Sequence, residues 1–164
     1  MMASTCKVYI AVDSEGAACV VGEPAGDGRI GAWQLDYVRQ RATEEATAAV
    51  LGARETGATD ILVHDVGFLR GYSPVGNVLL YDELPRGTRI ALGGAPIKQV
   101  AAEGFDAAFL LGHHAMAGDP SGVMAHTFST VSIASVHLNG QPIGEIGIES
   151  LQPVSYTHLR AHET

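Results

Sequence analysis

Acidic and histidine side chains occur in this chain at points where apolar, strand-like segments end. Carboxylate and imidazole groups gathered at the ends of strands are the donors that a hydrolytic metal site needs. Their types and positions therefore favour metal-assisted hydrolysis as the chemistry of this chain. The residues concerned are Asp13, Glu15, His113, His114, His126 and Glu145.

The first two acids lie two positions apart, directly after the apolar segment that ends at Val12. If the extended conformation continues, the side chains of Asp13 and Glu15 point the same way. Two negatively charged carboxylates at such a short distance repel each other unless a cation lies between them. The alternative is a solvated turn after a strand, where Asp and Gly are common.

His113 and His114 are adjacent and follow closely on another apolar segment, 107–111. Neighbouring residues on a strand face opposite ways, so at most one of His113 and His114 is expected in a given site. The carboxyl end of a parallel strand is where such sheets place their sites. The alternative is a pair of surface histidines.

The last two candidates lie in glycine-containing segments. His126 follows the loop 118–122, and an imidazole with an unperturbed pKa of about 6.5 can act as acid, base or nucleophile. Glu145 is flanked by apolar residues and glycines, which does not fit a solvated face. A role as ligand or general base and a role in a buried ion pair both remain open for Glu145.

The elements that must position these residues follow from hydrophobic patterning. Short apolar segments rich in β-branched residues alternate with segments of helical character, which predicts a mostly parallel α/β sheet flanked by helices. An Asn139-Gly140 pair predicts a hairpin-type turn. We expect strands at 6–12, 61–64, 88–92, 107–111 and 130–138, and helices at 33–56 and 97–103.

Composition excludes several classes of protein. Hydrophobic residues make up 46% of the 164 residues and charged residues 17%, so a sizeable core is expected and disorder is not. The net charge of −8 argues against nucleic acid as a partner, and no apolar run is long enough to span a bilayer. With only Cys6 and Cys19, a disulfide framework is not expected, and a cytoplasmic location fits best.

One glycine motif suggests a different function. Residues 26–31 match G-x-G-x-x-G, the dinucleotide-binding pattern, so a nucleotide-binding module is an alternative. That pattern should directly follow a strand, yet a long loop separates it from the strand at 6–12. The next strand ends at His64-Asp65, beyond the expected spacing. We therefore interpret these glycines as loop residues.

The end of the chain departs from the pattern before it. Residues 154–164 lose the apolar periodicity and resemble a translated sequencing adaptor, so we exclude them from the fold. His158 and His162 have the i, i+4 spacing of helical metal ligands, but they lie within this excluded tail. The expected organisation is an incomplete N-terminal α/β metal-site domain over 1–153, followed by a non-native tail over 154–164.

Six segments in order resemble the D-aminopeptidase family of binuclear zinc peptidases, peptidase family M55. The order and approximate spacing hold across residues 7–150, which corresponds to the first half of a family member. The resemblance thus implies a fold truncated before its C-terminal part. The matching segments are 11–16, 43–46, 61–65, 111–115, 122–127 and 139–147.

The resemblance also implies roles for single residues. Asp13, Glu15, His114 and Glu145 would be zinc ligands, with the aspartate bridging two metals. His126 would be the catalytic histidine, acting as nucleophile. The implied activity is zinc-dependent aminopeptidase hydrolysis of short peptides that contain D-amino acids, in a homo-oligomeric ring.

One position departs from the family pattern. Where the family has Asn-Asp-Ser-His, whose histidine binds zinc, this chain has His64-Asp65-Val66-Gly67. Gly67 has no side chain to coordinate, so one zinc is lost, or His64 is a substitute ligand, or water completes the shell. The departure leaves a second interpretation open: a divergent or inactive paralogue that binds metal or peptide without hydrolysis.

Overall fold

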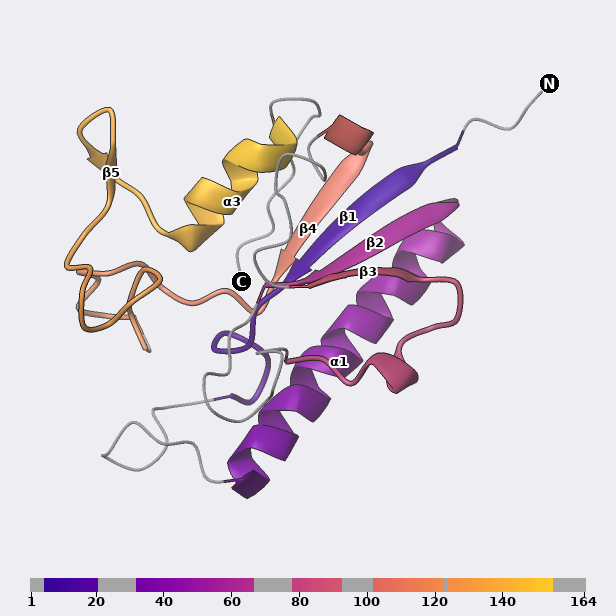
Figure 1. The fold of residues 1–164 in the computed structure, drawn as a ribbon, viewed down its shortest axis with the longest axis horizontal. Helices are drawn as coiled ribbons and strands as arrows, with labels where there is room; N and C mark the ends of the chain where they lie inside the picture. Colours follow the sequence, from indigo (N-terminus) through magenta and orange to yellow (C-terminus); the bar gives the residue numbers. More distant parts are fainter. Residues whose placement is uncertain (1–4, 21–31, 67–77, 93–101, 123, 155–164) are drawn as a thin grey trace.

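The computed structural model describes residues 5–20, 32–66, 78–92, 102–122 and 124–154 (Figure 1). Its main sheet has four strands in the order β3-β2-β1-β4, and every neighbouring pair is parallel. The mostly parallel α/β architecture predicted from the alternation of elements is confirmed. The strands are β1 Lys7–Val12, β2 Asp60–Asp65, β3 Arg89–Leu92 and β4 Ala107–Leu111.

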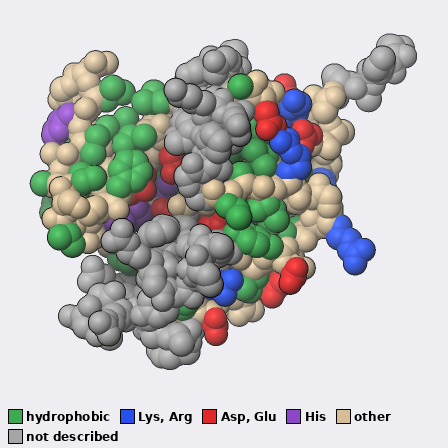
Figure 2. Space-filling view, in the orientation of Figure 1, with side chains coloured by type: hydrophobic (Ala, Val, Ile, Leu, Met, Phe, Trp, Pro, Cys, Tyr) green, Lys and Arg blue, Asp and Glu red, His purple; other side chains and the backbone are tan. Residues whose placement is uncertain are grey.

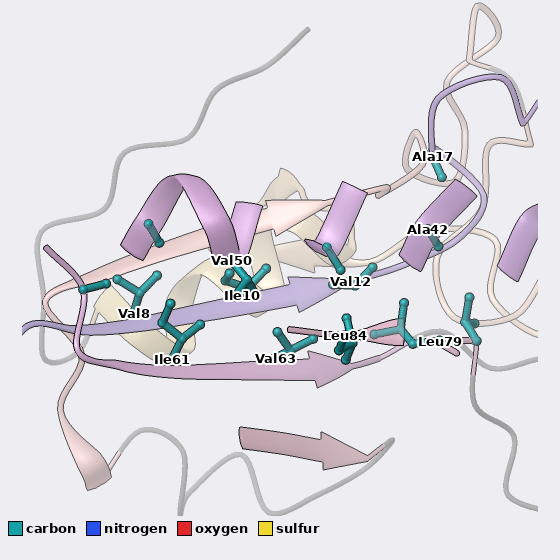
Figure 3. Close-up of a cluster of buried hydrophobic side chains, with 14 of the residues drawn as sticks. Val8, Ile10, Val12, Ala17, Ala42, Val50, Ile61, Val63, Leu79 and Leu84 are labelled. Carbon is teal, nitrogen blue, oxygen red and sulfur yellow. The ribbon is translucent and has the colours of Figure 1, made fainter. Parts of the chain in front are cut away.

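The long helix α1, Ala32–Glu55, covers one face of this sheet (Figure 1). The segment is rich in Ala, Glu, Gln and Arg, which are strong helix formers, and Gly57 ends it with a φ of +103°. Apolar side chains from β1 and β2 pack between the sheet and α1 (Figure 3). This core includes Val8, Ile10, Val12, Val50, Ile61 and Val63.

The opposite face of the sheet carries a smaller apolar cluster centred on Tyr9, Leu62 and Phe105. A second helix, α3 (Glu145–Val154), lies on this side (Figure 1). Sequence patterning did not predict α3, because glycines stand before and within its first turn. β1 and β2 are buried on both faces, which accounts for their continuous apolar runs, whereas Ile90 and Leu92 of the edge strand β3 are exposed.

A small lobe follows β4 and contains the hairpin of β5, His137–Leu138, and β6, Gln141–Pro142 (Figure 1). Asn139 and Gly140 form its turn with positive φ values of 51° and 79°, so the predicted hairpin turn is confirmed.

The predicted strand over 130–138 is wrong, since only its last two residues pair. Ser129 explains the difference. Its hydroxyl accepts from the backbone N–H of Ser132, and its carbonyl accepts from Ile133. These local bonds form turns in place of a strand ladder.

A buried carboxylate fixes the connection between β2 and β3. Asp65 Oδ2 accepts hydrogen bonds from the backbone N–H groups of Val78 and Leu79, at 2.8 Å each, and from the Tyr81 hydroxyl at 3.0 Å. The short 3-10 helix η1, Tyr81–Glu83, follows directly. Asp65 thus positions the segment that leads from Val78 into η1.

Several predictions fall outside the described residues. They are the glycine motif at 26–31, Gly67, most of the helix at 97–103, and the tail beyond Val154. Among the helices that the structure does describe, none has the length and apolar character needed to cross a membrane.

Candidate metal centre

The ends of β1 and β4 are joined by backbone hydrogen bonds that bring their following loops together. The Asp13 N–H donates to the Leu111 carbonyl at 2.9 Å, and the Gly16 N–H donates to the Gly112 carbonyl at 2.8 Å. A Cβ at Gly112 would lie 2.2 Å from the Asp13 carbonyl oxygen, and the φ of Gly112 is +66°. Only glycine therefore allows the two loops to approach this closely.

The carboxylates of Asp13 and Glu15 lie close together, although the chain bends at Ser14 and turns at Glu15 instead of continuing as a strand. Asp13 is 5% exposed, and its Oδ1 accepts from the Ser14 N–H at 2.8 Å. The Ser14 hydroxyl donates to Glu15 Oε2, also at 2.8 Å. Ser14 thus orients both carboxylates, a role that sequence patterning missed.

His114 faces these acids from the end of β4. Its Nε2 lies 3.1 Å from Glu145 Oε1 and 3.7 Å from Asp13 Oδ2. Its Nδ1 lies 2.9 Å from the Ala115 carbonyl oxygen, so Nδ1 carries the proton. A neutral His114 would then present an Nε2 lone pair to two carboxylates, which is favourable only with a proton or a cation between them.

His126 stacks on His114, with ring centroids 3.6 Å apart and ring planes 7° from parallel. Its Nδ1 donates to the Met124 carbonyl at 2.7 Å, which leaves Nε2 to act in the site. One donor atom from each of His114, His126 and Glu145 lies within 4.8 Å of the others. Lone pairs in two separate, nearly parallel ring planes do not converge, so the stacked rings are poorly arranged to ligate one ion together.

Burial and mutual repulsion perturb the first two acids. Burial raises the pKa of Asp13 well above its usual range, and the charges of Glu15 and Glu145 add to this rise. Burial alone would also raise the pKa of Glu15. Hydrogen bonds from Asp13 and Ser14 outweigh burial there and lower the pKa of Glu15. The two carboxylates interact, so they titrate as a pair and not independently.

On the other side of the site, the pKa of a histidine is raised and the pKa of a carboxyl group is lowered. Burial would lower the pKa of His114, but the Glu145 carboxylate outweighs it and raises this pKa. Burial opposes ionisation of Glu145, yet hydrogen bonds to His114 and to the Phe128 N–H lower its pKa. These shifts describe a cluster in which a positive charge stabilises several carboxylates.

The donor set fits zinc. Carboxylates and neutral imidazoles are usual Zn²⁺ ligands, and His114 holds its second nitrogen on a backbone carbonyl, as zinc-binding histidines do. Acidic and histidine side chains lie together beside the hydrophobic lobe at the left of the space-filling view (Figure 2).

The structure places His64 on the face of the sheet opposite α1, buried and paired through β2 with Ala11. Its Nδ1 lies 2.6 Å from the Tyr9 hydroxyl. This contact engages one ring nitrogen of His64. The role of His64 as a substitute zinc ligand remains a prediction.

His113 departs from the surface-histidine alternative, because its side chain is 3% exposed. It is not one of the three clustered donor residues, and its Nε2 lies 2.8 Å from Glu149 Oε2. Glu149 was not among the residues expected from sequence. The spacing of Glu145 and Glu149, four residues apart, was the available signal for a helix with two inward acids.

A family model described as D-aminopeptidase, peptidase family M55, matches residues 6–157. The chain belongs to the D-aminopeptidase family. Among solved structures, it is similar to the Zn-dependent D-aminopeptidase DppA from Bacillus subtilis, a self-compartmentalizing protease, with 28% identity and a TM-score of 0.70. The match covers 92% of this chain and 52% of that chain, so this chain spans about half the length of its structural relative. No curated protein sequence matches it.

Membership of the D-aminopeptidase family confirms the resemblance inferred from six ordered segments. No single segment is decisive, but six segments in the family's order are specific. The fold of DppA over the matched part is the same mostly parallel α/β architecture.

Proposed function

We propose that this chain forms part of a zinc-dependent aminopeptidase that hydrolyses short peptides containing D-amino acids. The observation that carries the proposal is the convergence of three groups from separate segments in a member of the D-aminopeptidase family. His114 Nε2 lies within 3.1 Å of Glu145 and 3.7 Å of Asp13. Asp13 follows β1, His114 follows β4 and Glu145 begins α3.

Four residues would hold the metal: Asp13, Glu15, His114 and Glu145. Zinc bound there would polarise a peptide carbonyl and stabilise the developing oxyanion. The chain itself supplies the orientation, since Ser14 holds both N-terminal carboxylates and the Ala115 carbonyl fixes the tautomer of His114. The acidic site would also attract the free amine of a short peptide.

His126 would be the reactive group rather than a further ligand. The Met124 carbonyl fixes its Nδ1 proton, so the neutral ring offers an Nε2 lone pair for nucleophilic attack or for proton transfer. Its parallel stacking on His114 supports this division of roles, because the two lone pairs do not converge on one ion.

The test is hydrolysis of D-alanyl-D-alanine by the zinc-loaded protein, with L-alanyl-L-alanine as the matched substrate. We expect release of D-alanine that a chelator abolishes and added Zn²⁺ restores, at a rate well above that for the L-peptide. A protein that binds no zinc and releases no D-alanine would refute the proposal.

The alternative is a divergent paralogue that binds metal or peptide without hydrolysis, and Gly67 favours it. Gly67→His should then raise both the zinc content and the hydrolysis rate, whereas no change in either would count against this idea. His64→Ala tests separately whether His64 is a substitute zinc ligand, because loss of zinc in this variant would support that role.

We further propose that the full-length protein is a cytoplasmic homo-oligomeric ring. DppA is described as self-compartmentalizing, and the lobe of this chain exposes apolar side chains of Phe128, Val131 and Leu138. Cys6 and Cys19 are both free thiols, which fits a reducing compartment. A monomeric mass in light scattering of the full-length protein would contradict the ring.

A further inference from the structure

Two neighbouring histidines hold two acids of one helix. His114 contacts Glu145, with Nε2 and Oε1 3.1 Å apart. His113 contacts Glu149, with Nε2 and Oε2 2.8 Å apart. Glu145 and Glu149 lie one turn apart on the same face of α3, so the two histidines after β4 contact successive turns of that face.

The second of these contacts lies outside the metal-donor cluster, which joins His114, His126 and Glu145. The side chains of His113 and Glu149 are only 3% and 12% exposed. His113 Nδ1 is also engaged, 3.1 Å from the Leu111 carbonyl oxygen. The pair is therefore anchored to the backbone of β4.

Glu149 lies in a desolvated place between α3 and the sheet. Burial, together with the nearby charge of Glu149, raises the pKa of Tyr9 in β1. Burying a carboxylate is costly unless it is paired with good geometry, and an apolar side chain would pack there at less cost. What the pair adds over an apolar contact is direction, because a hydrogen bond fixes how far α3 rotates about its axis.

That rotation decides where Glu145 points. Glu145 is the first residue of α3, where the chain enters the helix from the lobe. Gly144 packs against Met116, so close that a Cβ there would lie 2.6 Å from Met116 Cβ. The start of α3 is thus held by close packing, and its second turn is held by Glu149.

We infer that His113 and Glu149 are positioning residues that fix α3 so that the Glu145 carboxylate faces His114 at the metal centre. This inference rests on the proposed zinc function for its metal-binding consequence. The geometric consequence concerns the contact between His114 and Glu145 and is independent of zinc.

The test compares Glu149→Ala and Glu149→Gln with wild type in the full-length protein. Zn²⁺ affinity is measured by chelator competition, and Co²⁺ visible absorption reports the coordination geometry. We expect Glu149→Ala to lower Zn²⁺ affinity about 10- to 100-fold, the usual effect of losing a residue that orients a ligand, and to alter the Co²⁺ spectrum. Glu149→Gln keeps a side chain that can hydrogen-bond to His113 Nε2 as donor or acceptor, so its Zn²⁺ affinity should stay close to that of wild type.

Ser150→Ala is the matched control, since Ser150 neighbours Glu149 and its hydroxyl donates to the Ile146 carbonyl within α3. Circular dichroism and thermal melting establish that each variant is folded. Wild-type Zn²⁺ affinity in folded Glu149→Ala, or an equal loss in Ser150→Ala, would overturn the inference.

Imidazole ¹⁵N chemical shifts of His114 in the metal-free protein provide a second readout. Glu149→Ala should shift them, and Glu149→Gln should not. If wild type binds neither Zn²⁺ nor Co²⁺, the zinc function fails, while these shifts still decide the positioning role. Unchanged His114 shifts in Glu149→Ala would overturn that role.

Discussion

At the residue scale, the cost of burying Asp13 beside other acids is an observation that favours a cation at the proposed site. Asp13 is 5% exposed, and its carboxylate faces those of Glu15 and Glu145. Without a cation, burial and these charges raise its pKa, so ionisation of Asp13 destabilises the folded state. A bound metal would reverse that effect.

Asp13→Asn should therefore stabilise the metal-free protein while abolishing tight zinc binding. The raised pKa means that the stability linked to Asp13 is present below its unfolded pKa of about 3.9 and is lost as pH rises through the folded pKa. Asparagine stays neutral, so the variant should melt a few degrees higher at neutral pH, with the difference vanishing near about pH 4.

The measurement is thermal melting of both metal-free proteins across this pH range, with zinc titration at neutral pH. A difference in melting temperature that is independent of pH, or a variant that melts lower at neutral pH, would contradict the account.

Sequence indicated Asp13, Glu15 and His114 because they follow apolar strands, whereas His126 and Glu145 stood out by residue type within glycine-containing segments. It did not identify the contact between His113 and Glu149, since that contact depends on a helix hidden by Gly144 and Gly147. Nor did sequence reveal the stacking of His126 on His114, because the loop between them has no periodic pattern.

At the element scale, the site depends on how closely the loops after β1 and β4 approach. A Cβ at Gly16 would lie 2.1 Å from the His113 carbonyl oxygen. The atom that a Cβ would meet belongs to the backbone, so the two loops must move apart if a side chain is added at Gly16. The same loops carry Asp13, Glu15 and His114, which links backbone packing to the geometry of the site.

Gly16→Ala should lower the free energy of unfolding by about 1–3 kcal/mol, typical of overpacking, and should weaken zinc binding. Gly52→Ala is the matched control, because a Cβ at this exposed position in α1 meets nothing within 4 Å. The control should gain about 0.5–1 kcal/mol from improved helix propensity, with unchanged zinc affinity.

Urea unfolding and chelator competition measure both quantities. If Gly16→Ala bound zinc as tightly as Gly52→Ala, the close approach of the loops would be irrelevant to the site.

Elements with a strong local pattern were predictable. The four parallel strands and α1 are long or continuously apolar, and tertiary packing agrees with their local preference. A strand was wrongly predicted over 130–138 because apolar and polar residues alternate there. In the structure, serine side chains form local hydrogen bonds that favour turns.

At the scale of the whole molecule, the site exists only when four separate parts of the chain come together. The loop after β1 brings Asp13 and Glu15, the loop after β4 brings His114, the lobe brings His126, and α3 brings Glu145. The sheet order β3-β2-β1-β4 makes this possible, because it places β1 and β4 side by side with their carboxyl ends at one edge.

The central claim is that this assembled cluster divides its labour, with His114 holding zinc and His126 carrying out the reaction. Zinc content and hydrolysis of D-alanyl-D-alanine, measured together in His114→Ala and His126→Ala, test it most directly. We expect His114→Ala to lose zinc and activity together. His126→Ala should keep wild-type zinc content while its kcat falls roughly 10²- to 10⁴-fold. Loss of zinc from His126→Ala, or wild-type hydrolysis by that variant, would contradict the account.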